Sequence, residues 1–240
     1  MRMAESELQA MRRLEGGALR LASFASAGAG LLPEAIAAFS SEHPAVELSL
    51  IECEPPEAFD RLREGEIDLA LTFAFGEPRA DDTLAHDELL DDPLLVALPA
   101  GHPLADQPQV SLRSLRGQPW IKGAYTVEDT DRDGEQALAI PRSKVAFHGG
   151  DFMTVQGLVA AGAGVAVIPR LALLALRADV AVRPLTGRAS ARRIFATTLA
   201  PPFRSAAAER FVAALRDRAA DLRDRWQQDA GLLDLAAASG

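Results

Sequence analysis

The sequence predicts an α/β fold made of two Rossmann-like subdomains with a central cleft. Two observations lead to this prediction. Short apolar runs typical of buried strands alternate with segments of helical apolar spacing, first within residues 18–73 and again within residues 112–170. Extended segments at 83–90, 93–98 and 193–199 then connect the two halves. Because ligands bind beyond the carboxyl ends of strands in such sheets, we expect a binding site where these ends face the cleft.

The first half has the order strand, helix, strand, helix, strand, which favours a parallel sheet. A small-residue loop is expected after the first strand, at 25–30, and Pro55 is expected to open the second helix. The predicted strands are 19–24, 46–51 and 68–73, and the predicted helices begin at Leu31 and Pro55.

The second half begins near Leu112 and is centred on a helix that follows Asp151, a good N-cap residue. Gly162 is expected to end this helix with a positive φ angle. The run Val165–Ile168 then predicts a strand buried on both faces of a parallel sheet, and Pro169 ends it. The other predicted elements are strands at 119–122, 143–147, 180–184 and 193–199, a polar loop at 123–134, and helices at 3–15, 171–176 and 205–226.

Composition limits the possible partners and compartment. The chain has 240 residues and a net charge of −9, from 34 acidic and 25 basic residues. Phosphate contacts need a basic face, so we do not expect this chain to bind nucleic acid by itself. The single cysteine, Cys53, excludes an intrachain disulfide, and no apolar run approaches the roughly 20 residues that span a bilayer. We expect a cytoplasmic protein with no membrane partner.

Catalytic and metal-binding motifs are not found in the sequence. There is no phosphate-binding P-loop and no GxSxG motif, and the four histidines lack metal-ligand spacing. A triad of Ser23, His148 and Asp151 can be imagined, but serines near strand ends are common. Cys53 is interpreted as a small core residue. We therefore expect no enzyme activity, no cofactor and no metal.

One arginine cluster is interpreted as structural. Arg188 and Arg192 lie between the last two predicted strands, and Arg193 begins the second of them. We expect them to form a solvated hairpin edge.

A binding site remains as the functional hypothesis. Polar residues and glycines occur at or just past several predicted strand ends, and two helix N-termini are expected beside them. Helix N-termini favour an anion, commonly a carboxylate, although Asp151 adds negative charge at one of them. The predicted ligand-binding residues are Ser23, Ser26, Thr72, Phe73, Lys122, Gly123, Thr126, His148, Gly149, Asp151, Phe152 and Pro169.

Five segments in order resemble the effector-binding domain of LysR-type transcriptional regulators. They are GALRLASFASAGAGLLPEAIAAFSSEHPAVELSL at 17–50, LREGEIDLALTF at 62–73, LLVALPAGHPLA at 94–105, LRGQPWI at 115–121 and VQGLVAAGAGVAVIP at 155–169. The resemblance implies a fold like type 2 periplasmic binding proteins, with subdomain I at 17–98 and 198–228 and subdomain II at 99–197. A hinge is expected near Leu98 and Thr198. Residues 1–16 are interpreted as the end of a linker helix and 229–240 as a frayed tail.

The same resemblance implies a regulatory function. Family members sense a small effector, often an organic acid or an amino-acid-like molecule, in the cleft. We expect a homodimer or higher homo-oligomer, formed by the apolar surfaces of residues 31–39 and 83–98. DNA would be contacted only through a winged helix-turn-helix, which this chain lacks. The alternative is a stand-alone cytoplasmic or transport-type solute-binding protein on the same fold.

Overall fold

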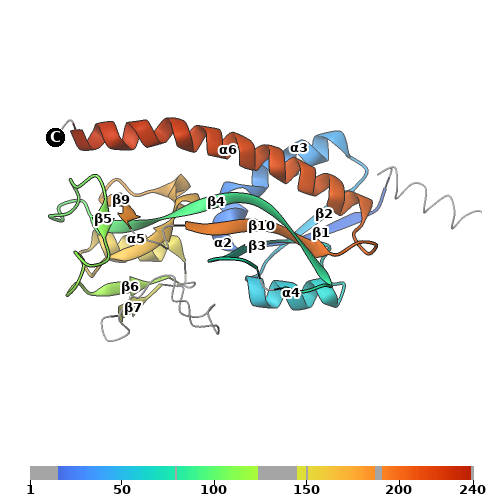
Figure 1. Cartoon of the computed structure of the whole chain (residues 1–240), viewed down its shortest axis with the longest axis horizontal. Helices are drawn as coiled ribbons and strands as arrows, with labels where there is room; N and C mark the ends of the chain where they lie inside the picture. The colour runs from blue at the N-terminus through green and yellow to red at the C-terminus, as the bar shows by residue number, and fades with distance from the viewer. Residues whose placement is uncertain (1–15, 79, 124–144, 150, 187–190, 239–240) are drawn as a thin grey trace, which may run out of the picture. The chain divides into compact units, whose positions relative to one another are not determined.

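A computed structural model describes residues 16–78, 80–123, 145–149, 151–186 and 191–238 (Figure 1). The chain divides into two compact units. Unit 1 comprises Met1–Leu90 and Arg193–Arg225, and unit 2 comprises Asp91–Arg192 and Trp226–Gly240. The chain therefore passes between the units at 90/91, at 192/193 and again at 225/226, and the first two passages lie a few residues before the predicted positions. The predicted helix at 3–15 and most of the predicted loop at 123–134 lie outside the described residues.

The sheet of unit 1 confirms the predicted parallel arrangement of the first three strands. Strand β1 pairs in parallel with both β2 and β3, and β10 adds an antiparallel strand beside β3. The strand order is β2-β1-β3-β10. The bounds are Ala18–Ser23 for β1, Glu47–Glu52 for β2, Leu69–Ala74 for β3 and Ala191–Leu199 for β10.

Helices cover both faces of this sheet. Helices α3 (Leu32–Glu42) and α6 (Ala206–Ala238) lie over one face, and α4 (Pro55–Arg63) lies over the other (Figure 1). The rings of Phe39 and Phe211 meet edge to face between α3 and α6, with centroids 5.2 Å apart. Such aromatic contacts add to the free energy gained by burying both rings.

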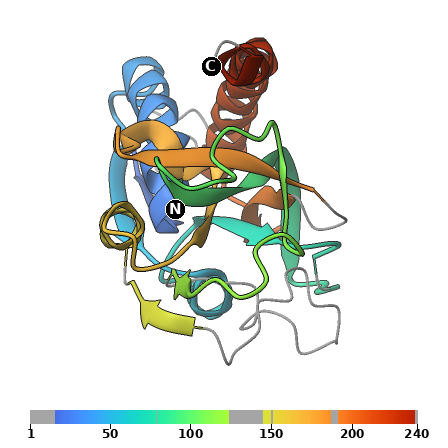
Figure 2. The same cartoon turned by 90° about the vertical axis from the view of Figure 1, so that its left-hand side faces the viewer.

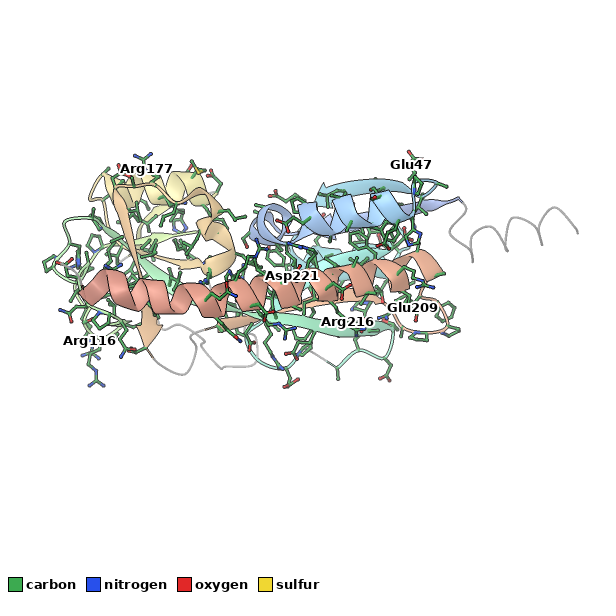
Figure 3. The ribbon with its side chains drawn as sticks, turned by 90° about the horizontal axis from the view of Figure 1, so that it is seen from above. Glu47, Arg116, Arg177, Glu209, Arg216 and Asp221 are labelled. Carbon is green, nitrogen blue, oxygen red and sulfur yellow. The ribbon has the colours of Figure 1, made fainter. Side chains whose placement is uncertain are left out.

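Helix α6 is longer than predicted. The apolar stripe predicted an end at Trp226 and a frayed tail after it, whereas the helix continues to Ala238. The added residues are rich in alanine and leucine, which have high helix propensity. Figure 3 shows Glu209, Arg216 and Asp221 along the part of α6 that belongs to unit 1.

The predicted loop at 25–30 is instead a short helix, α2 (Ala25–Gly30). Two glycines in six residues argued for a loop. The helix instead packs against the end of β1, where a Cβ atom at Gly28 would be in ordinary contact with Ser23 Oγ at 3.6 Å. Ser26 and Ala27 are buried by this packing. Tertiary packing therefore overrides the weak local preference.

Unit 2 contains two small sheets. Strand β4 is one continuous strand rather than the two predicted segments, and it pairs antiparallel with both β8 and β9. Strand β5 pairs in parallel with β9, and β6 pairs in parallel with β7. The bounds are Leu84–Pro99 for β4, Val110–Ser111 for β5, Trp120–Lys122 for β6, Val145–His148 for β7, Ala166–Pro169 for β8 and Val180–Thr186 for β9.

The prediction of a parallel sheet around β8 was wrong. An unbroken apolar run shows that a strand is buried but does not show the direction of its partner. Here β8 pairs with β4, and even Pro169 has a partner in the register, Leu94. Parallel character remains at β6, which pairs with β7 and forms an isolated parallel bridge from Trp120 to Val165.

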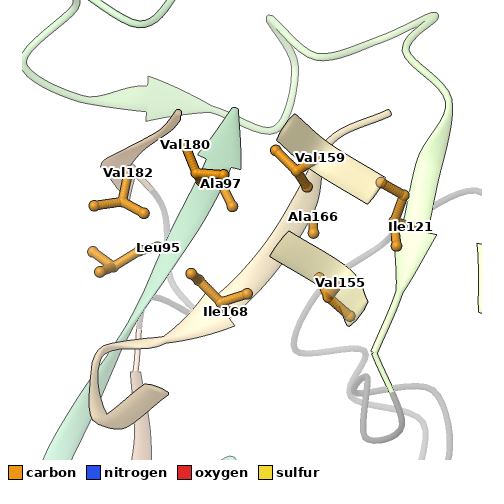
Figure 4. Close-up of a cluster of buried hydrophobic side chains, with 9 residues drawn as sticks. All are labelled: Leu95, Ala97, Ile121, Val155, Val159, Ala166, Ile168, Val180 and Val182. Atoms are coloured by element: carbon orange, nitrogen blue, oxygen red, sulfur yellow. The ribbon is translucent and has the colours of Figure 1, made fainter. Parts of the chain in front are cut away.

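The core of unit 2 lies between α5 (Phe152–Ala160) and the strands beneath it (Figure 4). Val155 and Val159 are one helical turn apart on α5, and both are at most 1% exposed. Gly162 follows the helix with φ of 73°, as predicted. The core residues are Leu95, Ala97, Ile121, Val155, Val159, Ala166, Ile168, Val180 and Val182.

A short 3₁₀ helix, η3 (Arg170–Ala175), follows β8 where a helix was predicted. Among the described residues, no helix is both long enough and apolar enough to cross a membrane.

Candidate functional site

Ser23 and Ser26 are both buried in unit 1. Ser23 ends β1, and its hydroxyl donates to the carbonyl oxygen of Phe24 at 3.2 Å. Ser26 lies within α2 rather than in a loop before it, and only 2% of its surface is exposed. Helix α2 has six residues. It is too short to offer the helix N-terminus on which the predicted anion site depended.

Thr72 belongs to a buried polar network that sequence reasoning missed. Its Oγ1 lies 2.7 Å from Thr197 Oγ1 on β10, and Thr197 Oγ1 lies 2.9 Å from His86 Nδ1 on β4. The rings of Phe59 and Phe195 pack edge to face against the imidazole of His86. Burial lowers the pKa of His86, although Asp81 and Asp87 partly oppose the shift. The hydroxyl of Thr72 therefore already has a protein partner.

Phe73 packs inside unit 1. It is 7% exposed, and its ring meets that of Phe24 edge to face at 5.0 Å. Its predicted role in ligand binding remains a prediction.

Lys122 and His148 end two neighbouring strands in unit 2. They are register partners in the parallel pair β6–β7, so their side chains leave the same face of this pair. The backbone N–H of Gly149 donates to the carbonyl oxygen of Lys122 at 2.8 Å, which joins the two strand ends. His148 is exposed, and Figure 2 shows β7, in yellow, at the margin of the fold. A cationic amine and an imidazole thus share one accessible edge.

Asp151 is the N-cap of α5, as predicted. Its Oδ1 accepts from the N–H groups of Met153 and Thr154 at 2.8 and 2.9 Å, and its Oδ2 accepts from the Thr154 hydroxyl at 2.8 Å. These bonds lower the pKa of Asp151, with those from Thr154 having the largest effect. The carboxylate thus occupies two of the donors that a bound anion would use. An anion at this helix N-terminus would therefore have to compete with the Asp151 carboxylate for these N–H groups.

The remaining predicted residues lie at several places in unit 2, apart from one that is not described. Gly149 is in close contact with α5, because a Cβ atom there would lie 2.6 Å from Val155 Cγ2. Gly123 follows β6, and Phe152 packs against the core of unit 2. Pro169 is buried at the end of β8. Thr126 lies outside the described residues.

The arginine cluster was predicted wrongly at one position. Arg192 is buried rather than solvated, and its guanidinium pairs with the carboxylate of Asp92 on β4 at 2.9 Å. The two acidic residues within the apolar run LLDDPLLVAL were the signal, because an acid inside a buried strand needs a partner. Arg193 is partly exposed and binds Glu77, while Arg188 lies outside the described residues.

The alternatives to a binding site gain no support from the geometry. Cys53 is 4% exposed, and burial raises the pKa of its thiol, as expected for a core cysteine. Ser23 belongs to unit 1, whereas His148 and Asp151 belong to unit 2. Within the described residues, no group of three His, Cys, Asp or Glu side chains could hold a metal ion.

Comparison with known families identifies the class of protein. The family model described as "LysR substrate binding domain" matches residues 12–220. The chain belongs to this family, whose members are the effector-binding domains of LysR-type regulators.

Curated relatives are named as transcriptional regulators. The chain is 34% identical over 180 residues to the probable HTH-type transcriptional regulator LrrA of Synechococcus elongatus, covering 75% of this chain and 59% of the relative. It is 32% identical over 160 residues to CatR of Pseudomonas putida, covering 62% and 51%. The chain thus spans a little over half the length of these relatives.

Solved structures share the fold. The BenM effector binding domain with its effector benzoate has a TM-score of 0.70 at 19% identity, covering 88% of this chain and 94% of that one. The reduced OxyR regulatory domain from Pseudomonas aeruginosa has a TM-score of 0.68 at 22% identity, covering 84% and 98%. The fold is therefore that of LysR effector-binding domains, similar to type 2 periplasmic binding proteins.

Proposed function

We propose that this chain is the sensing part of a LysR-type transcriptional regulator, and that a small organic anion binds at the carboxyl ends of β6 and β7. The observation that carries the proposal is the register pairing of Lys122 with His148. An ammonium group and an imidazole on one face attract a carboxylate, and the Lys side chain can form a charge-assisted hydrogen bond. Support also comes from BenM, a structural neighbour whose effector is benzoate.

The ligand also needs a hydrogen-bond donor. Asp151 follows His148 by three residues, and its carboxylate is ionised at neutral pH, as the lowered pKa further ensures. A simple anion would be repelled by this charge, whereas a molecule with an amino or hydroxyl group beside its carboxylate can donate to it. We therefore propose an amino acid or a hydroxy acid as the class of effector.

The polar groups of unit 1 have a different role in this proposal. Ser23 and Thr72 are buried and hydrogen-bonded inside their own unit. We propose that they shape the interior of unit 1, that Lys122 makes a charged contact with the ligand, and that the imidazole of His148 forms a hydrogen bond with it. Direct contacts from unit 1 to the ligand remain a prediction.

The partners of the whole regulator also belong to the proposal. DNA would be bound by a helix-turn-helix domain outside this chain, since the chain has a net charge of −9.

We also propose a homodimer. The apolar residues of α3 and β4 that first suggested it are largely buried within the chain itself. The proposal now rests on edge strand β2, where Leu50 and Ile51 are 46% and 38% exposed.

A calorimetric screen tests the site. The probes are benzoate, the amino acids and small hydroxy acids, each titrated into the parent chain and into Lys122→Met and His148→Gln. We expect both variants to bind the probe that the parent binds about tenfold more weakly, as for loss of a charge-assisted contact. Arg116→Met removes an exposed cation of the same unit and serves as the control. Unchanged affinity in both site variants would place the site elsewhere.

A further inference from the structure

A chain of hydrogen bonds crosses three strands inside unit 1. Strand β10 lies between β3 and β4 in the sheet. Thr197 Oγ1 on β10 lies 2.7 Å from Thr72 Oγ1 on β3 and 2.9 Å from His86 Nδ1 on β4. Thr72 is 1% exposed and Thr197 is 0% exposed. Because both hydroxyl groups are shielded from bulk solvent, their protons need acceptors inside the protein.

The number of protons sets the direction of these bonds when His86 is neutral. Each threonine hydroxyl has one proton to donate, and a neutral imidazole has one nitrogen that donates and one that accepts. If Nδ1 accepts, Thr197 donates to Nδ1 and Thr72 donates to Thr197, so both hydroxyl protons are used. If Nδ1 carries the proton, it donates to Thr197 instead, and one hydroxyl proton has no acceptor within the chain of bonds. An unpaired buried donor is costly, so the Nε2–H tautomer is favoured.

The surroundings of His86 also favour a neutral ring. Phe59 on α4 and Phe195 on β10 meet the imidazole edge to face. The charged groups that act on the ring are the carboxylates of Asp81 and Asp87. Burial lowers the pKa of His86, and these two carboxylates oppose the shift only in part.

Both carboxylates already have arginine partners. Asp81 pairs with Arg63 of α4 at 2.6 Å. Asp87 pairs with Arg216 of α6 at 2.6 Å and also with Arg204. Each arginine offsets the attraction that its acid would have for an imidazolium. Protonation of the ring therefore needs a pH below the ordinary pKa of histidine, about 6.5.

We propose that His86 controls the direction of the hydrogen bonds between Thr197 and Thr72, and thereby forms an acid-sensitive switch inside unit 1. Near neutral pH the bonds run from Thr72 through Thr197 to Nδ1. In acid the ring, which is only partly buried, takes up one proton from solvent at Nδ1. Nδ1–H then donates to Thr197, the Thr197 hydroxyl rotates to donate to Thr72, and the Thr72 proton turns to another acceptor. No covalent bond changes except the new N–H bond.

Nuclear magnetic resonance of the ring nitrogens tests the first step, with the full chain titrated from about pH 8 to about pH 5. At the upper pH we expect His86 Nδ1 to have the chemical shift of an unprotonated nitrogen and a coupling, across the hydrogen bond, to the Thr197 hydroxyl proton. Acid should protonate Nδ1 and abolish this coupling. His102 is the reference, because its Nδ1 accepts from the N–H of Leu104 at 3.2 Å. A protonated Nδ1 at the upper pH would overturn the proposal.

The threonine signals test whether the change is passed on. The methyl and hydroxyl resonances of Thr72 should shift with the same midpoint as the ring nitrogens of His86. Thr198 is the matched control, since it is also 0% exposed. Its hydroxyl donates to the Leu199 carbonyl oxygen at 3.0 Å and accepts from Arg204 Nε at 2.8 Å, so it should not follow this midpoint. Constant Thr72 signals during the titration of His86 would contradict the switch.

Two variants separate the switch from a purely structural network. In Thr197→Val the ring of His86 still titrates, but Thr72 should no longer respond to it, and Thr197→Ser should restore the response. His86→Gln covers the case in which Thr197→Val does not fold, and it should abolish the response of Thr72. A response that persists in His86→Gln would come from another titrating group and would overturn the proposal. No ligand enters these measurements, so their failure is separate from failure of the proposed binding site.

Discussion

The Oγ1 atoms of Thr72 and Thr197 lie 2.7 Å apart in the interior of unit 1, although 125 residues separate them in the chain. Each residue is at most 1% exposed. Thr197 also bonds to His86, so three strands share one polar network. Buried polar groups are tolerated when they are hydrogen-bonded and are costly when they lose a partner.

Thr197→Val should therefore destabilise the protein. It keeps the shape of the side chain but leaves Thr72 and His86 without their shared partner. We expect a loss of about 1–3 kcal/mol in the free energy of unfolding, measured by urea titration. Thr186→Val makes the same change at an exposed position on β9 and should have almost no effect. An equally stable Thr197→Val protein would show that the network adds nothing.

His86 should make stability depend on pH. Its folded-state pKa is lowered by burial, so the folded state favours the neutral ring. Its contribution to stability is complete above the unfolded pKa of about 6.5 and is lost as pH falls through the lowered folded-state value. Urea titrations from pH 7.5 downward should show this loss. His86→Gln should remove this pH dependence of stability, whereas His43→Gln, at the end of α3, should retain it. If the stability of His86→Gln fell with pH as much as that of the parent, the pH dependence would come from other titratable groups.

Two glycines of unit 2 should respond in opposite ways to alanine. At Gly164 a Cβ atom would lie 2.5 Å from the backbone oxygen of Pro119, so Gly164→Ala should destabilise by about 1–3 kcal/mol. At Gly157, within α5, a Cβ atom would meet nothing within 4 Å. Gly157→Ala should stabilise by about 0.5–1 kcal/mol, because alanine favours the helix. Thermal unfolding of both variants tests this contrast, and equal effects would contradict it.

The cap of α5 can be tested through hydrogen exchange. Asp151→Ala removes the acceptor for the N–H groups of Met153 and Thr154, so both should exchange faster. Asp151→Ser keeps a capping oxygen and should retain much of the protection. The lowered pKa means that protection should also decrease when acid protonates the carboxylate. If Asp151→Ala exchanged like the parent, the cap would be unimportant for the start of this helix.

Local patterns predicted those features that depend on neighbouring residues. The parallel βαβαβ order of unit 1, the N-cap at Asp151 and the positive φ at Gly162 each follow from a short stretch of sequence. The pairing of β8 with β4 did not follow, because an apolar run carries no information about strand direction. The helix at α2 depends on packing that local propensity cannot express.

The candidate site was predictable only in outline. Lys122 and His148 were expected at strand ends, and the structure makes them register partners. Ser23, Ser26 and Thr72 were chosen because polar residues at strand ends often face ligands, yet each is buried. Asp92 and Arg192 were missed as a pair, because 100 residues separate them in the sequence.

The two-segment composition of unit 1 bears on the order in which the protein forms during synthesis. Strands β1 to β3 leave the ribosome before unit 2, whereas β10 and α6 leave after residue 190. Until then the hydroxyl of Thr72 cannot form its hydrogen bond with Thr197, and the edge of β3 that β10 will occupy can pair with other strands. Most of unit 2 is continuous in the chain and can fold first. During this part of synthesis the nascent unit 1 therefore has an unpaired strand edge and is prone to aggregate unless a chaperone binds it.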